Sequence, residues 1–272
     1  LILHAMMTGT AARLAKWQRA MPPAPLGCAY LNFTASHDGI GMRPAEGVLS
    51  PEDQSVVIDT VRRIGGIVSM RALPDGTEAP YELNTTFFDA MSQTADGPDD
   101  FHLARYICSQ TIVMSLEGIP AFYIHSLLAT PNDHASVEKR GMNRAINRHL
   151  WDYDDLRSRL ANPGSVQAQV MGQMRRRLQI RRQQAAFHPN ATQFTLPMPD
   201  DRVLGLWRQS LDRQQSIFAL HNVSAQSVVI PDSAFNLIED RTWIDLLSGD
   251  HIGTGDITLA PYQCRWISNE GH

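Results

Sequence analysis

The sequence predicts an α/β fold followed by an antiparallel β-sheet domain, and three observations support this. Over residues 1–188, helical patterns alternate with two short β-rich runs at 28–34 and 120–124, as in βα units on a parallel sheet. Both runs end in polar loops, where the chemistry of such sheets is usually found. After His188-Pro189 the pattern changes to short alternating strands, expected at 192–196, 203–208, 216–221, 226–230, 241–246, 256–259 and 263–267. We therefore expect one domain over 1–188 and a β domain over 189–272.

The first elements follow from local patterns near the start of the chain. A helix over 1–20 is predicted by apolar residues near helical spacing, namely Leu3, Met6, Met7, Leu14 and Trp17. The run 28–34 is apolar and β-rich, which predicts a buried strand. In the segment 50–53, Ser stands at the N-cap position and Pro at the first helical position, so a helix is expected to begin there and to run to Gly65.

A hairpin and a long helix are expected next. The segments 66–70 and 80–84 are β-rich and flank the turn Pro74-Asp75-Gly76, which predicts an antiparallel hairpin. A long apolar helix is expected over about 99–116.

Another helix is expected over about 166–187. Its apolar residues recur every four positions on one face, namely Val166, Val170, Met174 and Leu178. The arginines at 175–177 and 181–182 belong to its polar side, and we expect them to form a solvated face.

The composition limits the class of protein. The chain has 272 residues, 43% of them hydrophobic, and its net charge of −4 argues against a nucleic-acid or strongly anionic membrane partner. No apolar run reaches the roughly 18–20 residues that span a bilayer. Cys28, Cys108 and Cys264 are too few and scattered for a disulfide framework or a zinc site, so we expect small buried thiols in a reducing, cytoplasmic compartment. Because residues 1–7 are a periodic apolar segment with no initiator Met, we expect a piece of a longer protein.

The strongest candidate site follows the first predicted strand. His37 and Asp38 stand side by side and precede Gly39 and Gly41, a pattern that suits close backbone approach to a small ligand. A solvated histidine in an Asx-type turn explains the local pattern equally well. A dinucleotide fingerprint is excluded, because Pro44 stands where a third glycine is required.

Two other segments carry candidate binding groups. The stretch 138–149 is rich in Arg and Asn, including Arg144, and offers several hydrogen-bond donors suited to sugar hydroxyls or a phosphate. The predicted hairpin carries Glu78, Tyr81 and Glu82, which suit the rim of a cleft. From the local pattern alone, a solvated basic loop and an ordinary turn are the simpler interpretations. The histidines show no metal-ligand spacing, so no metal is expected.

Taken together, these stretches resemble one enzyme family. Phe-Thr-Ala-Ser-His37-Asp38-Gly-Ile-Gly-Met-Arg-Pro-Ala-Glu-Gly resembles the last signature region of the α-amylase superfamily of (β/α)8-barrel enzymes. More narrowly, it is similar to the sucrose phosphorylase branch with its glucosylglycerate and glucosylglycerol phosphorylases, and the stretches 69–90, 118–133 and 143–149 match that branch closely. The resemblance implies that the α/β part is the C-terminal part of a (β/α)8 barrel, followed by the β domain of the family.

The resemblance also implies a role for each candidate residue. Asp38 matches the family's transition-state-stabilising carboxylate, and His37 matches a histidine that binds hydroxyl groups of the donor glucose. Arg144 matches an arginine that contacts the same glucose. A mobile loop that helps to select phosphate or acceptor is matched by Glu78, Tyr81 and Glu82.

The mechanism implied by the resemblance is a double displacement with retention. An Asp attacks the anomeric carbon of the donor, a Glu protonates the leaving group, and phosphate then takes the glucosyl unit. This needs two carboxyl groups about 5–5.5 Å apart, with further negative charge against the oxocarbenium-like transition state. In the family, nucleophile and acid lie on strands before the one that ends at Asp38, so we expect this chain to lack both and to be inactive alone.

The expected function is therefore that of a retaining glycoside phosphorylase. Its substrates would be an α-glucoside donor and inorganic phosphate, and no cofactor is implied. The segments around 124–126 and Glu78 favour a glucosylglycerate-type enzyme over a strict sucrose phosphorylase. Two alternatives stay open: a retaining α-glucosidase or transglucosidase of the same superfamily, and a non-catalytic sugar-binding fragment.

Overall fold

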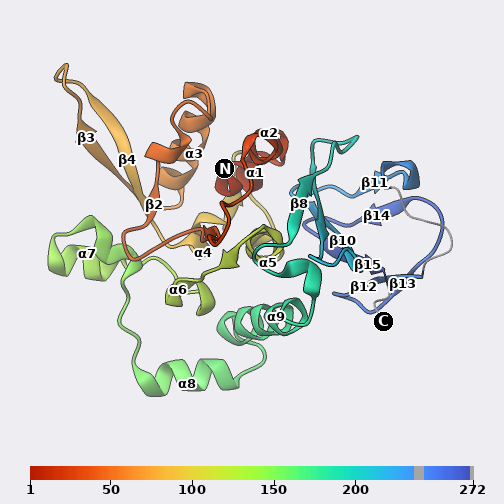
Figure 1. The fold of residues 1–272 in the computed structure, drawn as a ribbon. Helices are drawn as coiled ribbons and strands as arrows, with labels where there is room; N and C mark the ends of the chain where they lie inside the picture. The colour runs from red at the N-terminus through yellow and green to blue at the C-terminus, as the bar shows by residue number, and fades with distance from the viewer. Residues whose placement is uncertain (236–241, 270–272) are drawn as a thin grey trace.

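Helices dominate the first two thirds of the chain in the computed structural model, which describes residues 1–235 and 242–269 (Figure 1). These helices are α1 (Ile2–Thr8), α2 (Ala12–Ala20), α3 (Pro51–Arg63), α4 (Phe87–Ala90), α5 (His102–Ser115), α6 (Ile124–Leu127), α7 (His134–Arg140), α8 (Tyr153–Ala161) and α9 (Val166–Arg181). The strands among them are β1 (Leu31–Asn32), β2 (Ile40–Gly41), β3 (Ile67–Ala72), β4 (Glu78–Asn84), β5 (Gln93–Thr94), β6 (Gly97–Pro98) and β7 (Ile119–Pro120).

The predicted helix over 1–20 is wrong as a single element, because α1 ends before Gly9. This glycine has a φ of 70° and its N–H bonds to the carbonyl of Ala5, so it closes the first helix in the left-handed conformation. The start of α3 is confirmed: the Ser50 side chain accepts from the Asp53 N–H, and the Asp53 carboxylate accepts from the Ser50 N–H.

The two predicted strands of the α/β part pair with each other. Strands β1 and β7 are parallel, with Leu31 opposite Ile119, as expected for βα units. Both are shorter than predicted. The expectation of a buried first strand is wrong as well, because Leu31 is 61% exposed and Phe33 is 57% exposed. The second ends at Pro120, which has no N–H to donate to a neighbouring strand.

The predicted hairpin forms from β3 and β4 and projects from the body of the molecule (Figure 1). Strand β2 adds to its β4 edge and gives a three-stranded sheet in the order β2-β4-β3. This addition brings the loop that follows β1 against the base of the hairpin.

Helices α5 and α9 pack against each other in the interior. Helix α5 is buried along nearly its whole length, as predicted, and Val170 and Met174 of α9 are fully buried. The expectation of a solvated arginine face on α9 is wrong in part. Arg181 donates to the carbonyls of Met114 and Gly118, so it caps the end of α5 rather than facing solvent. Helices α7 and α8 were not predicted.

The rest of the described chain is an antiparallel β structure, as predicted. Its strands are β8 (Thr192–Thr195), β9 (Val203–Gln209), β10 (Ser216–Asn222), β11 (Val228–Ile230), β12 (Trp243–Asp245), β13 (His251–Ile252), β14 (Ile257–Leu259) and β15 (Cys264–Asn269). The main sheet has the order β13-β12-β15-β10-β9-β8, and β11 pairs with β14. Strand β13 was not predicted. Arg241, the first residue of the predicted strand 241–246, lies outside the described residues.

One apolar core joins the helical part to the sheet. It contains Met174 of α9 together with Leu206 of β9 and Trp266 of β15, while a second cluster lies within the β structure. A polar contact crosses the same boundary: the Trp266 indole N–H donates to the Ser115 hydroxyl at 2.8 Å. Within the described part of the chain, no helix is long and apolar enough to cross a membrane.

Candidate functional site

The candidate site is built on the loop that follows β1. A short bridge between Ser36 and Gly39 closes this loop around Asp38, and the Ser36 hydroxyl accepts from the Asp38 N–H at 3.2 Å. Gly39 has a φ of 117°, and a Cβ there would lie 2.4 Å from the carbonyl oxygen of Leu83. The glycine that follows the His-Asp pair is thus required for the loop to rest against β4.

Asp38 lies between two arginines. Its Oδ1 is 3.1 Å from Arg144 Nη1 and 2.9 Å from Arg148 Nη2, and His37 Nε2 is 3.3 Å from the same oxygen. The Asp38 side chain is 34% exposed. Among the described residues all of its ion pairs involve Oδ1, so Oδ2 is the oxygen best placed to accept from a hydroxyl group of a ligand.

Glu82 holds Arg144 from the other side. The Nε and Nη2 groups of Arg144 donate to the two carboxylate oxygens of Glu82 at 2.9 and 3.3 Å, a forked arrangement that fixes the plane of the guanidinium. The Glu82 side chain is only 8% exposed. Hydrogen bonding to Glu82, followed by the charge of Asp38, raises the pKa of Arg144 above its ordinary value.

Amide side chains connect the carboxylates to the backbone. Asn84 donates to the Glu82 carboxylate at 2.9 Å and to the backbone carbonyl of Asp38 at 3.0 Å. Asn147 donates to the carbonyl of Ser36 at 3.0 Å. Both ends of the Asp38 loop are therefore anchored, by β4 on one side and by the short 3-10 helix η2 (Asn143–Asn147) on the other.

The structure brings together most of the predicted site residues. One connected cluster contains four of them, namely His37, Asp38, Glu82 and Arg144. With Arg148, which also binds Asp38, we call it the Asp38 cluster. Tyr81 lies close enough to Arg144 for its phenol to influence the pKa of that arginine.

Glu78, Tyr81 and Glu82 all lie in strand β4, paired with β3, so they belong to the hairpin and not to a separate loop. Their expected role in selecting phosphate or acceptor stays a prediction. Glu78 is at the far, exposed end of the hairpin, opposite Ala72. Within the described part of the chain its carboxylate has no hydrogen bond or ion pair, so it is not part of the Asp38 cluster.

Arg148 was missed as a site residue, although it lies in a stretch that the sequence marked. Its Nη2 binds the Asp38 carboxylate, and its Nε donates to the backbone carbonyl of His37 at 2.7 Å. The sequence signal for Arg148 was its position four residues after Arg144. The 3-10 helix η2 between them places both guanidinium groups beside the Asp38 carboxylate.

A second polar cluster lies next to the first. Asp133 Oδ2 is 2.6 Å from His149 Nδ1, and the Trp151 indole N–H donates to the Thr130 hydroxyl. Burial raises the pKa of Asp133, but the hydrogen bonds from His149 and Ser136 outweigh it and leave that pKa below its ordinary value. These hydrogen bonds hold Asp133 in its charged form.

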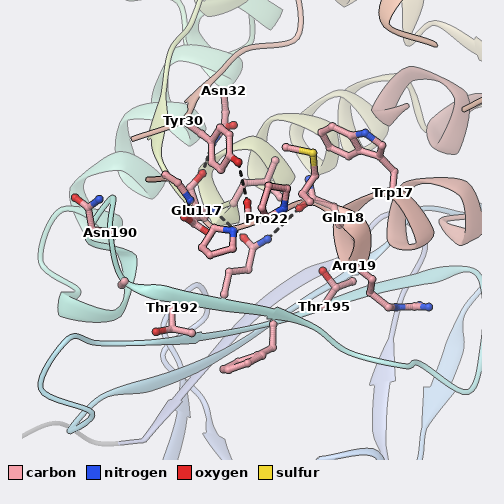
Figure 2. A pocket seen from close by; sticks show the side chains of 17 residues that line it. Trp17, Gln18, Arg19, Pro22, Tyr30, Asn32, Glu117, Asn190, Thr192 and Thr195 are labelled. Carbon is pink, nitrogen blue, oxygen red and sulfur yellow. Dashed lines mark hydrogen bonds between the residues drawn. The ribbon is translucent and has the colours of Figure 1, made fainter. Parts of the chain in front are cut away.

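An open cleft among the described residues lies elsewhere. It has a volume of about 570 Å³ between the end of α2 and β8, and Figure 2 shows Trp17, Tyr30, Glu117 and Thr192 around it. Tyr30 and Glu117 come before β1 and β7, whereas His37 and Asp38 come after β1. Since ligands of parallel sheets bind beyond the carboxyl ends of strands, the Asp38 cluster is the better candidate. No group of three or more His, Cys, Asp or Glu within residues 1–235 and 242–269 suits a metal ion.

Comparison with known proteins gives the cluster a context. No protein-family model matches the chain. The glucosylglycerate phosphorylase of Allomeiothermus silvanus is 38% identical over 268 residues, which are 98% of this chain and 45% of that protein. The glucosylglycerate phosphorylase of Escherichia coli is 33% identical over 267 residues, which are 98% of this chain and 46% of that protein. The chain is a homologue of the sucrose phosphorylase branch.

The relatives and the fold agree about which part of this branch the chain resembles. The chain spans less than half the length of these curated phosphorylases and corresponds to their C-terminal portion. Its fold is similar to the crystal structure of a sucrose 6F-phosphate phosphorylase from Thermoanaerobacter thermosaccharolyticum, with a TM-score of 0.64 and 19% identity over 95% of this chain and 46% of that one. This likeness confirms the predicted fold class.

Proposed function

We propose that this chain is the portion of a retaining glycoside phosphorylase that supplies the transition-state-stabilising carboxylate, Asp38. The complete enzyme would convert an α-glucoside and inorganic phosphate to glucose 1-phosphate. The observation that carries the proposal is a half-exposed Asp38 held by two arginines in a homologue of glucosylglycerate phosphorylases. Negative charge fixed in this way suits an oxocarbenium-like transition state, since it needs no reorganisation during the reaction.

In this proposal the other members of the Asp38 cluster bind the donor sugar. His37, which is 66% exposed on its side chain, and Arg144 present N–H donors beside Asp38, where hydroxyl groups of a glucose unit would lie. Arg148 joins them as a donor that also orients the carboxylate. Tyr81 and Glu82 would act on the phosphate or acceptor side, and Glu82 would also orient Arg144 toward the donor glucose. Glu78 lies at the far end of the hairpin, so its position does not support a direct role at the site.

The nucleophile and the acid are proposed to come from the part of the relatives that this chain does not match. Closure of β1 and β7 into a complete (β/α)8 barrel and the domain division at 188/189 belong to the same proposal. A cytoplasmic location is also part of it, supported by three cysteines that are all free thiols. The proposed donor is glucosylglycerate, because the relatives of 33–38% identity are named glucosylglycerate phosphorylases.

A chimeric enzyme tests this proposal. In this chimera, the segment of the Allomeiothermus silvanus phosphorylase that matches this chain is replaced by this chain. The products formed from glucosylglycerate are then measured with and without phosphate. Glucose 1-phosphate that forms only with phosphate is the expected result. Free glucose, formed regardless of phosphate, would instead identify a hydrolase.

The chain alone and the binding of the donor complete the experiment. The 272-residue chain by itself is expected to release no glucose 1-phosphate, and release by that chain would overturn the assignment of the missing groups. A folded chimera that binds glucosylglycerate and forms neither product would favour a non-catalytic sugar-binding fragment.

A further inference from the structure

Two cysteines far apart in the sequence meet at the junction of the helical part and the sheet. Cys108 of α5 and Cys264 of β15 are 156 positions apart, and their Sγ atoms lie 3.5 Å from each other. The expectation that all three cysteines are buried is wrong: Cys108 is buried, Cys264 is half-buried and Cys28 is exposed. Spacing in the sequence gave no indication of this pair.

The surroundings of the pair favour reaction at Cys264. Cys108 is 1% exposed, its Sγ lies 3.4 Å from the carbonyl oxygen of Asn222, and burial raises the pKa of its thiol. Cys264 reaches the surface, where a small oxidant has access. A partly exposed sulfur near a positive charge is the usual setting of a reactive cysteine.

Arg177 of α9 supplies that charge. Burial lowers the pKa of Arg177, whereas negative charge at Cys264, and then at Cys108, raises it, so Arg177 is close enough to both sulfurs to interact with their charge. Within the described residues its buried Nε has no hydrogen-bond partner, while Nη1 donates to Gln173. A positive group with a donor to spare is the kind of neighbour found beside reactive cysteines, so Arg177 adds to the setting that the two adjacent sulfurs create.

We propose that Cys108 and Cys264 form a reversible disulfide when the protein meets a peroxide. The Cys264 sulfur attacks one oxygen of hydrogen peroxide, the O–O bond breaks, and a sulfenic acid and one water are formed. The Cys108 sulfur then attacks the Cys264 sulfur, the S–O bond breaks, and hydroxide leaves and takes the Cys108 proton as a second water. Two thiols are oxidised to one disulfide while one peroxide is reduced to two waters.

The bond would tie the two parts of the chain together. The sulfurs must approach by about 1.5 Å to reach the length of a disulfide, which side-chain rotation and small shifts of α5 and β15 can supply. Cross-linking positions so distant in sequence restricts the unfolded chain strongly. The oxidised protein is therefore expected to melt roughly 5–10 °C higher than the reduced protein.

Peroxide treatment of the purified 272-residue chain tests the proposal, with peptide mapping by mass spectrometry and thermal melting as readouts. The expected product is a cross-linked peptide pair containing Cys108 and Cys264, with a raised melting temperature that dithiothreitol reverses. The Cys264→Ser variant should lose both effects. The Cys28→Ser variant should keep both, because Cys28 lies outside the pair.

Two results would overturn the proposal. One is oxidation of Cys264 to the sulfinic acid while Cys108 stays a free thiol, since this would show that the sulfurs do not close. The other is oxidation confined to Cys28 with the pair unmodified. Mapping of the unmutated chain decides between these results and the disulfide even if a variant fails to fold.

Discussion

The buried histidine at the junction of helix and sheet should make the stability of this protein depend on pH. His221 of β10 is fully buried; its Nε2 lies 2.9 Å from the Ser115 hydroxyl oxygen, and its Nδ1 lies 3.2 Å from the carbonyl oxygen of Leu204. Burial lowers the pKa of His221 to about 4. In the folded protein this ring therefore stays neutral at pH values where an exposed histidine is charged.

The size of the effect follows from linkage. Between pH 6.5 and 4 the unfolded chain binds a proton at His221 that the folded protein does not, so the free energy of unfolding falls as the pH falls. With an ordinary histidine pKa of about 6.5 in the unfolded chain, lowering the pH from 7 to 5 costs about 2 kcal/mol from this residue. Above about pH 7.5 the contribution no longer changes appreciably, because the ring is then neutral in both states.

Urea unfolding at pH 7 and at pH 5 measures this loss. The His221→Asn variant, which cannot titrate there, should lose about 2 kcal/mol less than the parent over that interval, whatever its own stability. Other buried histidines contribute to both proteins, so the difference isolates His221. His188→Asn, a change at an exposed histidine, is the matched control. Equal pH dependence in the parent and His221→Asn would refute the reasoning.

Two further predictions concern packing. Gly118→Ala should destabilise the protein far more than Gly97→Ala. Both glycines have positive φ, but only at Gly118 would a Cβ meet a backbone atom, the Tyr30 carbonyl oxygen at 2.4 Å. Equal urea midpoints for the two variants would contradict this. Met174→Ala should cost about 2–5 kcal/mol, because Met174 is fully buried in the core shared by α9 and the sheet, whereas Met142→Ala, at a residue 40% exposed, should change the midpoint little. A similar loss in both Met variants would contradict the assigned core.

The elements that the sequence predicted well are those fixed by local chemistry. The Ser50 N-cap and the apolar stripe of α9 depend on residues within a turn of each other, and both were confirmed. Gly9 was overlooked because the apolar pattern continues across it, although a glycine in the left-handed conformation ends α1. Helix α8 has no buried residue, so it has no apolar stripe that would have indicated it.

The candidate site could be predicted only in part, because its contacts join distant segments. His37 and Asp38 were found from adjacent residues and from the family resemblance. The pairing of Asp38 with Arg148 spans 110 positions, and that of Glu82 with Arg144 spans 62, so no local spacing encodes them. They exist because β2 pairs with β4 and η2 lies beside β4.

The central claim is that Asp38 stabilises the transition state of glucosyl transfer, and turnover by the chimeric phosphorylase tests it most directly. Asp38→Asn keeps the size of the side chain and removes its charge, so kcat for phosphate-dependent glucose 1-phosphate formation should fall by about 10²–10³-fold or more. Asp155→Asn, at an exposed position on α8, should leave kcat unchanged. A folded Asp38→Asn chimera with kcat within about tenfold of the parent would contradict the claim.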